Sequence, residues 1–259
     1  CTTIIYSGNR KEIDSEKIKA DKGISKLIEI HEEPFENDIN HIAGYSTLPL
    51  YRYFVIENTI DTLILDALKW KIKEADIVLS NGFRFCPPNA SPDKTGNIPI
   101  TNGYIFDMLP VDSVVRTGSV KGKQIFDWLE KELNNVFAKD ASQRLGGWVI
   151  KFKGMKISFK AFEENGRRVK DVEVNGSPLD LAKTYRICAC EREGDPEDML
   201  CRMRGVVNPK NTAFTLHSVL KEYLSVNSPV TPSPPMSAKV LDASQTLLTQ
   251  VTGVDYQFS

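Results

Sequence analysis

Apolar residues recur at helical spacing in four segments of the chain. The first segment, residues 14–35, carries a narrow stripe of Ile24, Leu27, Ile28 and His31 among charged residues. In the second, Asn58 stands where an N-cap is expected, and Asp61 follows three residues later. The predicted buried face of this second helix comprises Ile60, Leu63, Ile64, Ala67 and Leu68. Residues 121–137 and 211–224 carry similar stripes, so the sequence predicts four amphipathic helices.

Strand patterns fill the intervals between these helices. Residues 75–80 form a short apolar run that predicts a buried strand. Apolar and polar residues alternate over 148–162, where Gly154 marks a bend or bulge, and again over 168–174. An Asn-Gly turn then leads toward another strand over 183–190. Because the helix-then-strand order recurs, the sequence predicts a mixed α/β fold.

Composition places the chain among ordinary globular proteins. Lys and Arg number 33 against 34 Asp and Glu, so the formal net charge is −1 and we expect no nucleic-acid partner. No run of about 18 apolar residues occurs, so we expect no transmembrane helix. Residues 228–239 contain four prolines and predict an extended tether on the surface.

The cysteines raise two separate questions. The sequence starts at Cys1, which is either the lipid-bearing cysteine of a processed bacterial lipoprotein or the arbitrary start of a domain. Cys188 and Cys190 point to the same face of one predicted strand, and their C-x-C spacing lacks a matching second pair. We therefore expect buried free thiols, or one disulfide with Cys201 in an oxidising compartment, in preference to a zinc site.

The chain lacks the usual residue patterns of an independent catalyst. Its three histidines, His31, His41 and His217, fall in none of the H-E-x-x-H, D-x-H or G-N-H-[DE] patterns. The G-x-S-x-G, G-x-G-x-x-G and G-x-x-x-x-G-K-[ST] patterns are absent as well. We therefore predict no catalytic residue, no metal ligand and no cofactor within this chain.

An arginine just after the strand at 75–80 is the first candidate for binding chemistry. The stretch VLSNGFRF places Asn81 and Gly82 ahead of Arg84. Glycine lets the backbone come close to a ligand, and a guanidinium can grip a phosphate, sulfate or carboxylate with two parallel hydrogen bonds. The alternative is that Arg84 forms an ordinary ion pair with an acidic side chain, or caps a helix carbonyl.

Several ordered motifs resemble the C-terminal domain of the 5′-nucleotidase family of dinuclear metallophosphoesterases. They are DIVLSNGFR, GNIPITNGYIFDMLPVDSVVRTGSVKGKQIFDWLE, GGWVIKFKGMKISF and GRRVKDVEVNGSPLDLAKTYRICA. The resemblance covers roughly residues 46–225, and the helix at 14–35 is similar to the linker between the family's two halves. It implies mixed sheets flanked by helices, with an N-terminal segment over 1–45. A substrate-binding domain then spans 46–259 and includes a Pro-rich tail from about residue 228.

The resemblance also implies which residues contact the substrate. NGFRF and PLYRYFVIENTIDTLILDAL are similar to the thiosulfohydrolase branch of the family. Arg84 corresponds to the family's anion-contacting arginine, and Asn81, Gly82 and Arg52 are candidates beside it. Asp112, in the LPVDS stretch, is a further candidate.

Two departures from the family argue against a nucleoside substrate. Nucleotide-hydrolysing members stack the base between two aromatic side chains, whereas Val111 and Arg192 stand at or near those positions here. The loop EREGDPEDM could offer Arg192 to a second anionic group, or it could be a solvated charged loop.

The family's catalytic half has no counterpart in residues 1–45. In the family, that half supplies the ligands of two divalent metals. We therefore expect a substrate-recognition domain that acts with a metallophosphoesterase domain or subunit on a small anionic substrate of phosphate- or sulfate-ester type. The expected location is outside the cytoplasm, as a periplasmic or outer-membrane lipoprotein of a bacterium. The alternative is a stand-alone anion-binding lipoprotein that has lost catalysis.

Overall fold

The computed structural model describes residues 18–52, 54–80, 88–146, 149–192 and 194–249. The chain divides into two compact units, Cys1–Asn40 and His41–Ser259. The first unit contains α1 (Lys22–Glu32), η1 (Glu33–Phe35) and α2 (Glu36–Ile39). The single helix predicted over 14–35 is therefore wrong in its extent. The Asp21 side chain caps α1 by accepting hydrogen bonds from the backbone of Gly23 and Ile24, and Pro34 stands in the short 3-10 helix that follows α1.

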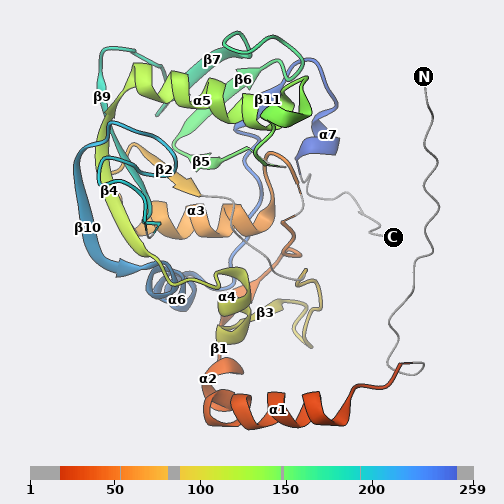
Figure 1. Cartoon of the computed structure of the whole chain (residues 1–259). Coiled ribbons are helices and arrows are strands. Elements are labelled where there is room, and N and C mark those ends of the chain that lie inside the picture. Colours follow the sequence, from red (N-terminus) through yellow and green to blue (C-terminus); the bar gives the residue numbers. More distant parts are fainter. Residues whose placement is uncertain (1–17, 53, 81–87, 147–148, 193, 250–259) are drawn as a thin grey trace, which may run out of the picture. The chain divides into compact units, whose positions relative to one another are not determined.

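The second unit contains three sheets within the described residues (Figure 1). A five-stranded sheet has the order β10-β4-β9-β2-β5, with bounds Val207–Thr215, Val114–Lys121, Thr184–Cys190, Ile77–Ser80 and Lys151–Lys153. A four-stranded sheet has the order β11-β6-β7-β8, with bounds Ala238–Val240, Met155–Phe159, Val169–Val174 and Ser177–Pro178. β1 (Ile42–Ser46) and β3 (Ile98–Thr101) form an antiparallel pair. Because β2 runs parallel to β9 and β11 parallel to β6 while the other pairs are antiparallel, the larger sheets are mixed, as predicted.

Helices flank these sheets. The longer ones are α3 (Thr59–Lys71), α5 (Gly122–Phe137) and α6 (Leu216–Asn227), and the shorter ones are α4 (Asn102–Met108), η2 (Ala141–Gln143) and α7 (Gln245–Leu248). α3 begins where the sequence predicts, because the Asn58 side chain accepts a hydrogen bond from the backbone N–H of Asp61 at 2.8 Å. All five residues of its predicted buried face are buried. The helix predicted over 121–137 is confirmed as α5.

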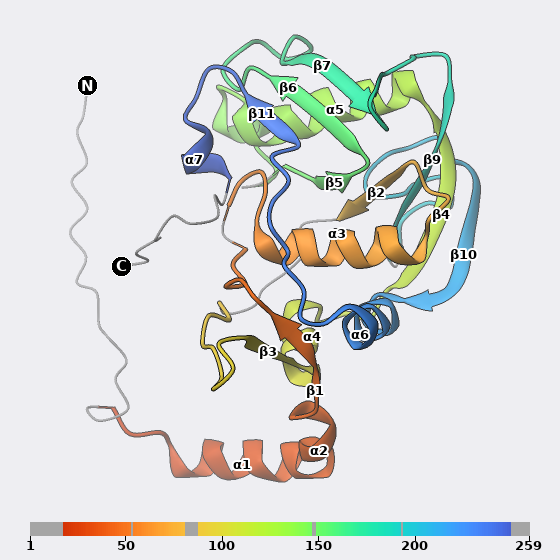
Figure 2. The ribbon, with the colours of Figure 1, turned by 180° about the vertical axis from the view of Figure 1, so that it is seen from behind.

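The five-stranded sheet separates two apolar cores. On one face, Ile77 and Leu79 of β2 pack with residues of α5 and of the four-stranded sheet. On the other face, Val78 packs with residues of α3 and α6. Both views of the ribbon place β2 between α5 and α3 (Figures 1 and 2). The buried strand predicted over 75–80 is therefore confirmed, with both of its faces covered.

Two turns have backbone conformations that glycine and asparagine adopt more readily than other residues. Gly154, between β5 and β6, has a φ of +94°, and a Cβ atom there would lie 2.0 Å from the carbonyl oxygen of Asp76. Asn175 and Gly176 both have positive φ and connect β7 to β8, as the Asn-Gly signal predicts. The bend predicted at Gly154 thus lets two chain segments approach more closely than any side chain would permit.

Two sequence predictions for the C-terminal part need correction. Residues 211–224 were expected to form one helix, but β10 continues to Thr215 because it pairs with β4, and α6 starts only after Thr215 caps the Ser218 N–H. The Pro-rich segment is extended, but it is not a free tether. Val230 exchanges backbone hydrogen bonds with Thr47 and Tyr45, and β11 then joins β6. No helix in the described ranges is long and apolar enough to cross a membrane.

The cysteines of the second unit follow the first of the two expectations. Cys188, Cys190 and Cys201 are buried free thiols. Cys188 and Cys190 lie in one apolar core and Cys201 in the other, so the disulfide with Cys201 does not form. Burial raises the pKa of the Cys188 thiol to about 12, which keeps the sulfur protonated and unreactive. Cys1 lies outside the described residues.

Candidate functional site at the carboxyl edge of the central sheet

The predicted binding residues that the structure describes gather toward one edge of the five-stranded sheet. β2 and β9 run parallel, so their carboxyl ends lie at the same edge. β4 is antiparallel to β9, with Val115 opposite Cys190, which brings the segment that carries Asp112 to this edge. Arg192 follows the end of β9. Open α/β sheets commonly bind their ligands at such an edge.

Three of the predicted residues, Asn81, Gly82 and Arg84, lie outside the described residues. In the sequence they directly follow Ser80, the last residue of β2. Their assignment as anion ligands stays a prediction.

Asp112 is engaged in holding the start of α6. One of its carboxylate oxygens accepts a hydrogen bond from the backbone N–H of His217 at 2.9 Å, and the other lies 3.8 Å from His217 Nδ1. His217 Nε2 lies 2.7 Å from the carbonyl oxygen of Leu109, which can only accept, so Nε2 carries a proton. A carboxylate at a helix N-terminus is favourable, and this contact gives Asp112 a structural role at the sheet edge.

The two positions where nucleotide-hydrolysing relatives use aromatic rings are at the surface here. The Val111 side chain is 70% exposed, and Arg192 is also exposed. Neither offers the flat apolar face on which a base could stack.

Arg52 is the predicted ligand that the structure holds most firmly. It is 7% exposed, and its Nε lies 3.9 Å from Oδ2 of the buried Asp61. Asp61 also accepts hydrogen bonds from Asn58 Nδ2 at 2.7 Å and from Ser80 Oγ at 3.0 Å. Because Ser80 ends β2, Asp61 connects the first turn of α3, Arg52 and the carboxyl end of β2. Contact with Asp61 through Nε uses one of the five N–H donors of the guanidinium.

Lys151 and Glu57 complete a group of buried charges beside Arg52 and Asp61. We refer to Arg52, Glu57, Asp61 and Lys151 as the buried charge cluster. Lys151 is 3% exposed, and its Nζ donates hydrogen bonds to the carbonyl oxygens of Val55 and Val149, both at 2.7 Å. Glu57 accepts a hydrogen bond from the backbone N–H of Ser237 at 2.9 Å, which fastens the Pro-rich segment to the loop before α3.

Burial moves both of these titratable groups toward neutrality. It raises the pKa of Glu57 to about 7, although backbone hydrogen bonds and the charge of Lys151 oppose the shift. Burial likewise lowers the pKa of Lys151 to about 7, against the attraction of the Asp61 and Glu57 carboxylates. Both groups therefore change protonation near pH 7, where the cluster can exchange protons with solvent at little cost.

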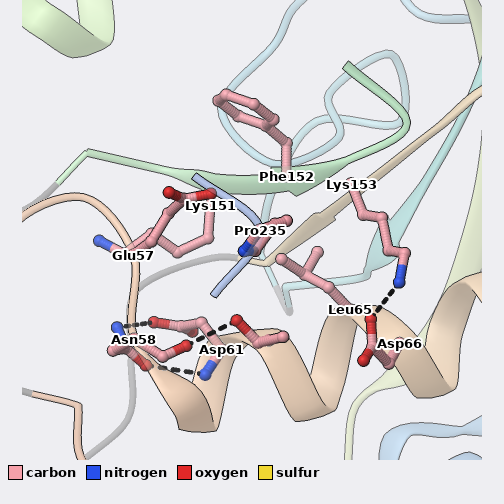
Figure 3. Close-up of a pocket in the computed structure, with 10 residues that line it drawn as sticks. Glu57, Asn58, Asp61, Leu65, Asp66, Lys151, Phe152, Lys153 and Pro235 are labelled. Atoms are coloured by element: carbon pink, nitrogen blue, oxygen red, sulfur yellow. Dashed lines mark hydrogen bonds and ion pairs between the residues drawn. The ribbon is translucent and has the colours of Figure 1, made fainter. Parts of the chain in front are cut away.

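The space enclosed by these side chains is too small for a substrate. Figure 3 shows Glu57, Asp61 and Lys151 around one small cavity, with Asp66 paired to Lys153 at its outer end. The cavity volume is about 10 Å³, which is room for no more than one water molecule. The buried charge cluster is therefore a packed support for Arg52 and for the end of β2.

Sequence reasoning missed three members of this support. Asp61 was recognised only as a residue of the helix start, and Glu57 and Lys151 were not singled out. A charged residue at a buried phase of a pattern was the available signal, since Lys151 follows Val149 at strand spacing. That signal is weak, because lysine at the same phase is usual on exposed strands.

The described residues do not supply a metal centre. Within them, no three His, Cys, Asp or Glu side chains come together as a possible ligand set. They therefore do not fit the two divalent metals that the family resemblance implies, and any such metals would need other ligands.

The sequence profile of the 5′-nucleotidase C-terminal domain matches residues 39–191, which is more than half of the chain. The chain belongs to this family. Protein UshA of Salmonella pullorum is 27% identical over 131 residues, which cover 51% of this chain and 22% of the relative. The family predicted from the ordered motifs is thus confirmed.

Solved structures share the fold. Sulfate thiohydrolase SoxB of Thermus thermophilus, solved in complex with glycerol, has a TM-score of 0.65 at 20% identity and matches 92% of this chain. A 5′-nucleotidase precursor, also from Thermus thermophilus, has a TM-score of 0.67 at 20% identity and matches 85%. Because the two scores are so close, fold similarity does not choose between the branches of the family. The chain spans only 40% and 43% of these two proteins.

Proposed function

We propose that this domain recognises the substrate of a 5′-nucleotidase-like metallohydrolase, and that a separate metallophosphoesterase domain or subunit supplies the metals and the reaction. In this proposal Arg52 and Arg84 bind the anionic end of the substrate at the carboxyl edge of the central sheet. The observation that carries the proposal is the buried charge cluster, which fixes an arginine at that edge through Asp61 and Ser80.

Two further observations support the division of labour. The chain spans less than half of the solved relatives, so those proteins contain substantial additional structure. The described residues of this chain contain no metal-ligand set of their own. Two divalent metals, when bound by the partner, would activate the attacking water. The residues of this chain would bind and orient the substrate.

The proposed substrate is a small phosphate or sulfate ester without a stacked base. The exposed Val111 and Arg192 support this choice, since neither provides a base-stacking surface. Arg192 would face a second anionic group from the loop after β9. We place this function outside the cytoplasm on the basis of the family resemblance.

Activity assays of the purified chain test the proposal directly. With Mn²⁺ added, we expect no hydrolysis of p-nitrophenyl phosphate or adenosine monophosphate by the chain alone. Robust turnover by the pure protein would overturn the proposal. Hydrolysis that appears only when a metallophosphoesterase protein from the same genome is added would support it.

Ligand binding tests the role of Arg52. By calorimetry, the chain should bind a small phosphate or sulfate ester, and Arg52→Gln should weaken binding by about tenfold or more, since a charge-assisted hydrogen bond is lost. Arg52→Lys, which keeps the charge, should retain part of the affinity, and the exposed Arg167→Gln serves as the matched control. Circular dichroism confirms that each variant is folded at the assay temperature. Equal affinity for wild type and Arg52→Gln would contradict the assignment, whereas binding without turnover in any combination of proteins would favour a stand-alone binding protein.

A further inference from the structure

A second, open hollow lies on the five-stranded sheet near the start of β2, at the opposite end from Ser80. Its volume is about 340 Å³, which falls within the usual range of small-molecule sites. We refer to it as the basic hollow. Its polar and charged lining residues are Glu74, Thr117, Ser119, Arg186, Asn208 and Lys210.

Strand register places four of these side chains on one face of the sheet. Ser119 of β4 pairs with Arg186 of β9, and Thr117 of β4 pairs with Lys210 of β10. Directly opposed residues of antiparallel strands point to the same face, and so do residues two apart on one strand. Arg186 and Lys210 therefore rise on either side of β4, with the hydroxyl groups of Thr117 and Ser119 on the strand between them.

The backbone that carries these cations is held rigidly. The N–H of Arg186 donates to Asp76 Oδ2 at 2.8 Å, and its carbonyl oxygen accepts from the Asp76 N–H at 2.9 Å. The register of β10 shifts between Val207 and Lys210, where Asn208 adopts a positive φ of 52°. Such a bulge redirects a side chain, and Asn208 lines the basic hollow.

The charged groups themselves are not neutralised by the protein. Over the described ranges, neither the Arg186 guanidinium nor the Lys210 ammonium group forms a hydrogen bond or an ion pair, and both side chains are exposed. Glu74 also lines the hollow, so two cations face one carboxylate and the net charge of the lining is positive. Two rigidly placed and uncompensated cations attract an anion.

We propose that the basic hollow binds a tetrahedral oxyanion, a phosphate or sulfate group. Arg186 and Lys210 grip the group from opposite sides of β4, and the Ser119 hydroxyl and Asn208 amide donate to the remaining oxygens. The hollow is larger than a bare oxyanion, so it has room for the small organic part of a monoester. Glu74 accepts a hydrogen bond from a hydroxyl group of that part and repels any further negative charge.

Calorimetric titration of the full chain with inorganic phosphate, sulfate and glycerol 3-phosphate tests the proposal. We expect saturable binding of at least one probe, weakened by raising the NaCl concentration. Arg186→Gln and Lys210→Gln should each weaken it by about tenfold, since each removes charge-assisted hydrogen bonds. Glu74→Gln should tighten the binding of inorganic phosphate. Comparable affinities for the three probes identify the free oxyanion as the ligand, and tighter binding of glycerol 3-phosphate identifies a monoester.

Two controls separate this site from the carboxyl edge. The exposed Lys160→Gln should leave binding unchanged, and Arg52→Lys should leave the component that depends on Arg186 unchanged. All the substituted side chains of the basic hollow are at the surface, so the variants should fold like the wild type. The proposal is overturned if none of the probes binds at millimolar concentration, or if Arg186→Gln binds each of them as tightly as the wild type does.

Discussion

The two ends of β2 treat charge in opposite ways. At the carboxyl end, the four residues of the buried charge cluster are almost fully removed from water, and hydrogen bonds or opposite charges surround each of them. At the other end, Arg186 and Lys210 stand in the open basic hollow. A buried charge without a partner costs several kcal/mol, whereas an exposed one remains hydrated.

This difference assigns different tasks to the two ends. Charges that are buried must satisfy one another, so their arrangement specifies the positions of the backbone segments that carry them. Exposed charges stabilise the fold very little, so they remain available to a ligand. The comparison predicts that substitutions near the buried contacts of β2 act on stability, and that substitutions in the basic hollow act on binding.

The largest effect is expected where the backbone itself is in contact with the start of β2. Gly154→Ala would place a methyl group 2.0 Å from the Asp76 carbonyl oxygen in a left-handed conformation. We expect the free energy of unfolding to fall by about 4 kcal/mol in urea denaturation. Gly96→Ala is the matched control, since Gly96 also has positive φ but nothing lies within 4 Å of the added atom, and its cost should be about 1 kcal/mol. Equal costs for both variants would show that the close approach is relieved by movement of the chain.

Removal of one buried carboxylate should have the next largest effect. Asp61→Asn leaves the Arg52 guanidinium uncompensated and turns an amide donor toward the Asn58 amide. We expect a loss of about 3 kcal/mol in the free energy of unfolding. Asp66→Asn, on the same helix, breaks the partly exposed pair with Lys153 and should cost less than about 1 kcal/mol. If Asp61→Asn were as mild as this control, the cluster would not be a support.

The pH dependence of stability should report the burial of Glu57. Its folded pKa of about 7 lies above the ordinary 4.5, so its contribution to stability is present below pH 4.5 and is lost as the pH rises through 7. The stability of the wild type relative to Glu57→Gln should therefore fall by up to about 3 kcal/mol between pH 4.5 and pH 7. Urea denaturation at several pH values measures this difference, with the exposed Glu164→Gln as control. A flat difference profile would contradict burial of the carboxyl group.

Lys151 should act in the opposite direction on the alkaline side. Its folded pKa of about 7 lies below the ordinary 10.5, so its contribution is present above pH 10.5 and is lost as the pH falls through 7. The stability of the wild type relative to Lys151→Met should rise between pH 7 and pH 10, by up to about 4 kcal/mol. The same denaturation series measures this change. A difference that falls over this range would show that Lys151 stays charged.

The smallest effects on stability are expected in the basic hollow. Arg186→Gln and Lys210→Gln each remove an exposed charge without a protein partner among the described residues, so the free energy of unfolding should change by no more than about 0.5 kcal/mol. Thermal and urea denaturation without added phosphate or sulfate measure the change. A loss above about 1 kcal/mol would mean that these cations stabilise the sheet, and the contrast between the two ends of β2 would disappear.

Local patterns predicted the secondary structure best where one face of an element is buried. α3 and α5 follow their apolar stripes, and the Asn58 cap lies where the sequence indicates. Prediction failed where pairing between distant segments overrode local preference. Residues up to Thr215 have a helical pattern but form β10, because they complete the edge of the sheet beside β4.

The candidate sites were less accessible to sequence reasoning. Arg52 and Asp112 were found through family motifs, but the contacts that hold them are made with Asp61 and His217, which no functional motif singles out. The basic hollow left no motif at all. Arg186 and Lys210 are 24 positions apart in the chain, and they flank one strand only because β9 and β10 both pair with β4.

The sequence by itself determined the family, the mixed α/β class and the positions of the main helices and strands. These features follow from periodicity, capping residues and ordered motifs, which act over a few neighbouring residues. Only the tertiary structure decided which charges are buried together and which remain open. Burial and electrostatic interaction depend on distances between segments that are far apart in sequence, so the same lysine can support a strand at position 151 and await an anion at position 210.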